Sequence, residues 1–98
     1  MTVKTADIVQ CSNGRDAGRL FLVVDTAEQL VYLADGKHRK VSRPKKKNMK
    51  HVLLKGKLTG VEAERIHSGD KITDKAIRNI MAAYAAGKIE GQEGTSVG

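Results

Sequence analysis

The sequence predicts a small, mainly β domain: a twisted barrel of short strands with an α-helix packed on it near the C-terminus. Short apolar runs rich in β-formers alternate with turn residues through the first half of the chain. Farther along, apolar residues recur at helical spacing between capping residues. With 98 residues, of which 40% are hydrophobic, the chain suits one small core.

Four or five short strands are expected. Residues 7–11 are β-branched and short, and residues 19–24 form an apolar run too short for a typical helix. Residues 30–34 make a third strand. The next, over 37–42, should return antiparallel to it, and strand character resumes at 51–54. Short strands with tight turns favour a barrel over an open sheet.

Glycine, aspartate and proline mark the connections. Residues 12–18 form a loop of turn formers with two glycines, and residues 25–29 turn the chain. Asp35-Gly36 is a strong hairpin signal because a type I′ turn needs positive φ. Pro44 lacks an N–H, so the lysine run at 45–47 should be an edge strand or a loop.

Two helices are predicted after the strands. The stretch 56–69 is ambiguous, and a short helix over 61–67 would turn Val61 and Ile66 inward. The second runs over 74–86, with Thr73 as N-cap and Gly87 as C-cap. Its packed stripe is Ile77, Ile80, Met81 and Tyr84. The expected organisation is a barrel over 6–58, a helical extension over 59–87 and a disordered tail over 88–98.

Positive charge is concentrated in one segment. The chain has 18 Lys and Arg and 11 Asp and Glu, for a net charge of +7. Ten of the basic residues, and no acidic one, fall within residues 37–57, so the rest of the chain carries −3. Such a density of like charge is typical of a surface that meets a polyanion. The ten are Lys37, Arg39, Lys40, Arg43, Lys45, Lys46, Lys47, Lys50, Lys55 and Lys57.

No enzyme or cofactor motif stands out. The single cysteine, Cys11, cannot form an internal disulfide and lacks the neighbours of a nucleophile. The three histidines are dispersed, so no zinc pattern is present. The first residues lack the apolar region of a signal peptide, and no segment is apolar enough to span a bilayer. We expect a non-catalytic cytoplasmic protein without cofactor, metal, membrane or small-molecule substrate.

Part of the sequence resembles the KOW motif. The similarity lies in Ile8-Val9, the stretch 14–19, Val23 and the strand 30–33. The continuation over 41–52, with its Arg-Pro-Lys-rich run, is similar to the basic segment of archaeal and eukaryotic large-subunit ribosomal proteins and small bacterial KOW proteins. The resemblance implies an SH3-like β-barrel that binds RNA, often ribosomal RNA, and maps the family's loop glycine onto Gly18. KOW modules also occur in transcription elongation factors.

The candidate RNA-binding residues lie in the glycine loop and the basic segment. Arginines suit bidentate phosphate contacts, whereas lysines act as point charges that do not read sequence. Of the three aromatics, Phe21, Tyr32 and Tyr84, none is interleaved with the basic run, which favours structured RNA over single strands. The predicted set is Gly14, Arg15, Gly18, Arg19, Lys37, His38, Arg39, Lys40, Arg43, Lys45, Lys46, Lys47, Lys50 and His51. A module that docks an acidic protein, or one that binds DNA, remains the alternative.

Overall fold

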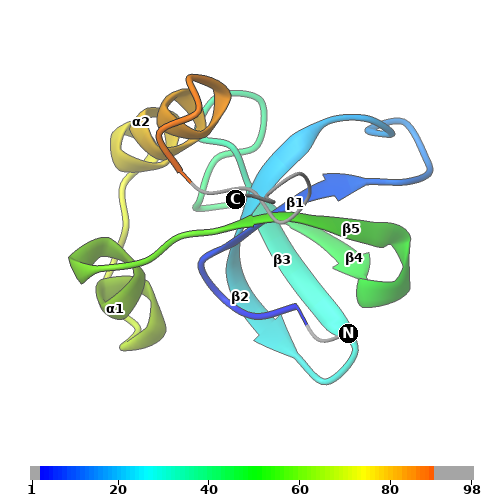
Figure 1. Ribbon diagram of the computed structural model, residues 1–98. Coiled ribbons are helices and arrows are strands. Elements are labelled where there is room, and N and C mark those ends of the chain that lie inside the picture. The colour runs from blue at the N-terminus through cyan, green and yellow to red at the C-terminus, as the bar shows by residue number, and fades with distance from the viewer. Residues whose placement is uncertain (1–2, 90–98) are drawn as a thin grey trace, which may run out of the picture.

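The computed structural model describes residues 3–89, which form one antiparallel sheet followed by two helices (Figure 1). The strands stand in the order β4-β3-β2-β1-β5, and each is antiparallel to its neighbours. Helices α1 and α2 lie together on one side of the sheet. The elements are β1 (Asp7–Cys11), β2 (Leu20–Ala27), β3 (Leu30–Ala34), β4 (Lys45–Asn48), a 3-10 turn (Met49–His51), β5 (Val52–Lys57), α1 (Val61–His67) and α2 (Asp74–Ala85).

Strands β1 and β3 have the predicted bounds, whereas β2 is longer than predicted. Residues 25–27, expected in a turn, pair with 30–32 of β3. A register shift between Val23 and Asp25 makes this possible, because the extra residue of a bulge increases the local twist and re-aims the strand. The turn is thereby reduced to Glu28 and Gln29, and Glu28 takes a φ of +57°.

The predicted strand over residues 37–42 is wrong. Gly36 has the positive φ that the hairpin signal implies, +79°, but the chain then forms a loop. The reason is Asp35, whose Oδ1 accepts hydrogen bonds from the backbone N–H groups of Lys37 (2.9 Å) and Arg39 (2.8 Å). Side-chain capping of this kind competes with ladder hydrogen bonds. The return strand is instead β4, the lysine run, which pairs with β3 at the edge of the sheet.

Both faces of the sheet are apolar. On one face, Ile8, Leu22 and Ala34 pack with Ile77 and Ile80 of α2. On the other face, residues including Val9, Phe21 and Val31 are fully buried in a cluster that contains no residue of α1 or α2. A sheet face can be buried in this way when the strands twist and curl around it. No backbone ladder joins β4 to β5 in the described part of the chain, so the architecture is a curled five-stranded sheet.

The first helix has the predicted bounds, but one of its inward residues is wrong. Ile66 is buried, whereas Val61 is 74% exposed and Ala63 takes the inner position. Residues three apart share a helix face, as 63 and 66 do, but residues five apart do not. The helix is therefore where it was expected, but Val61 and Ile66 cannot both face inward.

The second helix agrees closely with the prediction. Thr73 caps it by accepting a hydrogen bond from the Ala76 N–H (3.1 Å), and Ile77 and Ile80 are buried. The helix ends at Ala85, one residue early, and Gly87 takes a φ of +77°. Of the residues assigned to the predicted disordered tail, Ile89 is described and packs against the helix-side core. The remainder of that predicted tail, 90–98, lies outside the described residues.

Candidate nucleic-acid interface

The glycine loop between β1 and β2 is a compact turn. Gly14 and Gly18 have φ of +81° and +88°, and backbone hydrogen bonds join Ala17 to Gly14 (3.2 Å) and Arg19 to Asp16 (2.9 Å). The Gly18 N–H donates to the Cys11 carbonyl (2.9 Å) and is therefore engaged within the fold. The N–H of Gly18 is thus used inside the turn and is not free for a phosphate. The Arg15 side chain on this loop is exposed.

The three consecutive lysines of β4 fall on two faces of the sheet. Lys45 pairs with Leu33 and Lys47 with Val31, and residues directly opposite in an antiparallel ladder share a face. These two lysines therefore point to the curled, helix-free face. Lys46 pairs with Tyr32 and points to the other face, where it is exposed. The three lysines are consecutive and carry the same charge, but strand alternation separates them.

Lys45 and Lys47 are bound to the glycine loop. The Lys45 Nζ lies 2.9 Å from Asp16 Oδ2, and the Lys47 Nζ donates to the Asn13 carbonyl (3.0 Å). Asp16 also lies 3.7 Å from the Arg19 Nε. The hydrogen bond from Lys45 lowers the pKa of Asp16, and the charges of Arg19 and Arg39 lower it further against the effect of burial. Asp16 is thus a carboxylate held between cations from three segments.

The 3-10 turn before β5 meets the same loop. The Ser12 N–H donates to the His51 carbonyl (2.9 Å), and the Asn13 Nδ2 lies 3.0 Å from His51 Nδ1. Lys50 is exposed on the adjoining 3-10 turn. The loop of residues 12–19, β4 and this turn are therefore side by side. We call them the loop surface; its exposed cations include Arg15, Arg19 and Lys50.

The other predicted residues lie on the loop between β3 and β4, which is fixed to α2 (Figure 1). The Arg78 Nη1 donates to the Gly36 carbonyl (2.7 Å), and the Val41 N–H donates to Asp74 Oδ1 (2.7 Å). Burial acts to raise the pKa of Asp35, but hydrogen bonds from three backbone N–H groups of this loop lower it overall. This loop carries Lys37, His38, Arg39, Lys40 and Arg43, of which all but the half-buried Arg39 are exposed.

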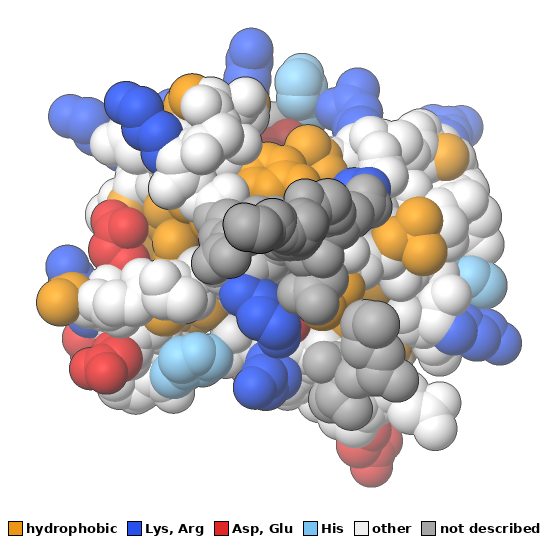
Figure 2. Space-filling model, in the orientation of Figure 1, with side chains coloured by type: hydrophobic (Ala, Val, Ile, Leu, Met, Phe, Trp, Pro, Cys, Tyr) orange, Lys and Arg blue, Asp and Glu red, His pale blue; other side chains and the backbone are white. Residues whose placement is uncertain are grey.

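The basic residues are thus spread over the surface and do not form a single cluster. In Figure 2, Lys and Arg side chains lie along the upper edge, at the sides and in the middle of the face, and several acidic side chains lie at the left, over the helices. Lys57, in the basic segment but not in the predicted site, lies at the far end of β5 and 3.7 Å from Asp7. Sequence reasoning missed Asp16 and Asn13, since only the fold brings them to the lysines.

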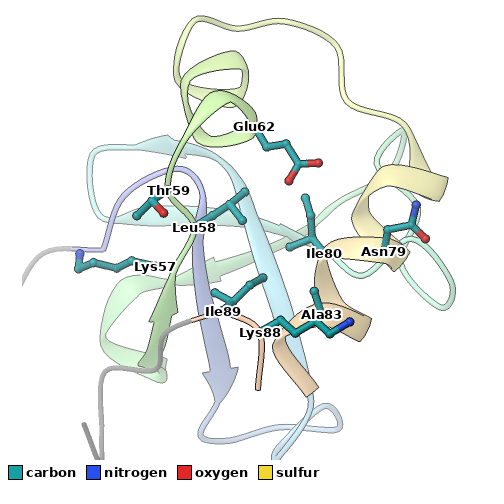
Figure 3. Close-up of a pocket in the computed structure, with 9 residues that line it drawn as sticks. All are labelled: Lys57, Leu58, Thr59, Glu62, Asn79, Ile80, Ala83, Lys88 and Ile89. Atoms are coloured by element: carbon teal, nitrogen blue, oxygen red, sulfur yellow. The ribbon is translucent and has the colours of Figure 1, made fainter. Parts of the chain in front are cut away.

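Two hollows adjoin the helices. One, of about 450 Å³, lies between the end of β5, the start of α1 and α2, and its lining includes Leu58, Ile80 and Glu62 (Figure 3). Another, of about 660 Å³, lies between β2, β3, the segment 41–44 and the α1–α2 connection. Within residues 3–89 there is no group of three or more His, Cys, Asp and Glu side chains placed to hold a metal ion. No helix in this range is long and apolar enough to cross a membrane.

The sequence matches no family model, and no curated protein is significantly similar to it.

Proposed function

We propose that this protein is a non-catalytic, cytoplasmic RNA-binding protein that holds structured RNA, such as ribosomal RNA, through phosphate contacts on the loop surface and the β3–β4 loop. The observation that carries the proposal is the meeting of the glycine loop, β4 and the 3-10 turn, which the contacts of Lys45, Lys47 and His51 bring together. Their exposed cations can contact one nucleic-acid backbone, and such contacts supply most sequence-independent affinity.

The proposal extends to the fold family. A curled five-stranded antiparallel sheet with a glycine loop between its first two strands is compatible with an SH3-like barrel of the KOW type. In such a barrel, the side chains of Lys45 and Lys47 would link β4 to the β1–β2 loop, where no backbone ladder connects them. The shape of a duplex or folded RNA suits this surface better than a flexible strand does, because a run of bases finds no row of exposed rings: Phe21 is buried, and Tyr32 and Tyr84 are half-buried.

The experiment is a titration of the protein with a paired RNA hairpin at several salt concentrations. If about 4–7 phosphates are contacted, log K should fall with log salt at roughly 0.7–0.9 per phosphate. Lys50→Ala, which removes an exposed cation of the loop surface, should reduce the slope by about one phosphate's share. A slope near zero would contradict the proposal. Equal affinity for the DNA hairpin of the same sequence would favour a general nucleic-acid binder, and a flat slope with retention of an acidic protein would favour a docking module.

A further inference from the structure

The hollow of about 660 Å³ has an aromatic side chain beside the basic segment. Its wall includes Tyr32 from β3 and Pro44, which immediately precedes β4. Tyr32 is half-buried, and Lys46 stands directly opposite it in the ladder and on the same face. No hydrogen bond of the Tyr32 hydroxyl is found among residues 3–89. The fold thus brings together a tyrosine and a lysine that are fourteen positions apart in the chain.

The lining of the hollow is mostly apolar, with a polar rim. Val24, Val41, Ile66 and Ile72 join Tyr32 in forming apolar walls. One side is fixed by a contact between Thr5 Oγ1 and His67 Nδ1 (2.7 Å). The volume is within the range of ligand pockets, roughly 300–1,000 Å³, and apolar walls with a few polar groups are their usual composition. A flat aromatic base with polar edges fits such walls.

The charged side chains around the hollow indicate the chemical class of its ligand. Lys71 lines the hollow, Arg43 lies between the lining residues Ser42 and Pro44, and Lys46 stands beside Tyr32. Of the three, Lys71 lines the hollow itself, and the exposed Arg43 and Lys46 adjoin residues that line it. The carboxylates of Asp25 and Asp70 also line the hollow, and they would repel a phosphate but can accept hydrogen bonds from the N–H groups of a base. Cations with acceptors suit a nucleotide better than an apolar peptide.

We propose that this hollow takes one unpaired nucleotide from an otherwise structured RNA, with its base against Tyr32 and its phosphate near Arg43, Lys46 and Lys71. The inference rests on the proposed function and narrows it to RNA that carries a bulged or flipped-out nucleotide. Unstacked bases in bulges and loops are what proteins hold against aromatic side chains. A single ring accommodates one base and not a run, so the preference for structured RNA is retained.

The test compares two RNA hairpins with the same stem, one fully paired and one with a single unpaired nucleotide in mid-stem. Stacking on one aromatic ring should favour the bulged hairpin by about tenfold at equal salt. Tyr32→Leu should remove this preference and leave the affinity for the paired hairpin unchanged. Tyr84→Phe, which loses only the 3.3 Å contact of its hydroxyl with the Lys55 carbonyl, is the matched control and should retain the preference.

A second measurement uses the unaltered protein and does not depend on how Tyr32→Leu folds. With 4-thiouridine as the unpaired nucleotide, ultraviolet light should crosslink the RNA to peptides that line the hollow. Equal affinity for the two hairpins, or crosslinks confined to residues 12–19, would overturn the inference while leaving the proposed function in place. Failure of the paired hairpin to bind would overturn both. Equal affinity is also the result expected if the hollow is occupied by a partner protein's peptide.

Discussion

At the scale of single residues, neighbouring lysines with the same charge have different tasks. Lys45 is 20% exposed and bound to Asp16, whereas Lys46 is exposed and points to the other face of the sheet. A charge run in a strand cannot act as one unit, because alternate side chains point in opposite directions. In this run, Lys45 and Lys47 make structural contacts with the glycine loop, and Lys46 remains exposed.

Lys45→Ala and Lys46→Ala therefore form a matched pair that changes the net charge equally. The first leaves Asp16 without its 2.9 Å partner and should lower the free energy of unfolding by about 1–2 kcal/mol. The second should change it by less than about 0.5 kcal/mol, as is usual for exposed sites. Urea unfolding of both variants provides the measurement. Equal losses would mean that the Lys45–Asp16 contact contributes no stability.

Asp16 should also give stability a dependence on pH. Its pKa in the folded protein is held below the ordinary value of 3.8, chiefly by the Lys45 hydrogen bond. A lowered folded-state pKa stabilises the fold above the ordinary value, and that stabilisation is lost as the pH falls through the folded pKa. The unfolding free energies of wild type and Asp16→Asn should therefore differ near neutral pH and converge below 3.8. Asp35 is present in both, so its own contribution cancels.

At the scale of elements, the loop between β3 and β4 is held in place by α2. Gly36 lies against the helix so closely that a Cβ there would be 2.4 Å from the Asp74 carbonyl oxygen and 3.0 Å from the Arg78 side chain. The contacts of Gly36 and Val41 with α2 explain why this segment forms a docked loop and not a second hairpin strand. Helix and basic loop are thus one structural unit.

Gly36→Ala should destabilise the protein more than Gly69→Ala does. Both glycines have positive φ, +79° and +86°, so both variants carry the backbone strain of roughly 1 kcal/mol. Only at Gly36 does the added methyl meet backbone, since nothing lies within 4 Å at Gly69. Thermal unfolding of the two variants measures the difference. Equal melting temperatures would show that the loop can move away from α2 at no cost.

The packing of α2 can be tested by one charge placed on its inner or outer side. Ile80 is 3% exposed, so Ile80→Asp would bury an unpaired charge and should lower the free energy of unfolding by roughly 3 kcal/mol or more. Asn79→Asp, an exposed neighbour on the same helix, adds the same charge without burial and is the control. Circular dichroism melts should separate the two clearly. Similar melting temperatures would place α2 outside the cooperative fold.

At the scale of the whole molecule, the chain has a net charge of +7, and its exposed cations lie on several separate segments. Arg15 and Lys50 lie on adjoining segments that the Ser12–His51 and Asn13–His51 contacts connect. Lys75, in contrast, is exposed on α2. If one RNA backbone crosses the loop surface, the first two cations should act together and the third independently.

A double-mutant cycle on RNA affinity tests this. Arg15→Ala and Lys50→Ala should be non-additive, with a coupling of about 0.5 kcal/mol or more, because both contact the same RNA element. Arg15→Ala and Lys75→Ala should add within about 0.5 kcal/mol. The binding titrations are made at one salt concentration, with folding checked for every variant. Additive losses in both cycles would indicate independent patches.

The sequence by itself determined α2, the positions of β1 and β3, and the concentration of charge. Each depends on a signal local in the chain: the Thr73 cap and Ile77–Ile80 spacing for α2, and short β-branched runs for strands. The tertiary structure alone decided that 37–42 forms a loop, that Asp16 binds Lys45, and that Lys46 stands beside Tyr32. These three features depend on contacts between segments that are distant in the chain. Strand pairing and helix docking determine such contacts, and the spacing of residues along the chain does not.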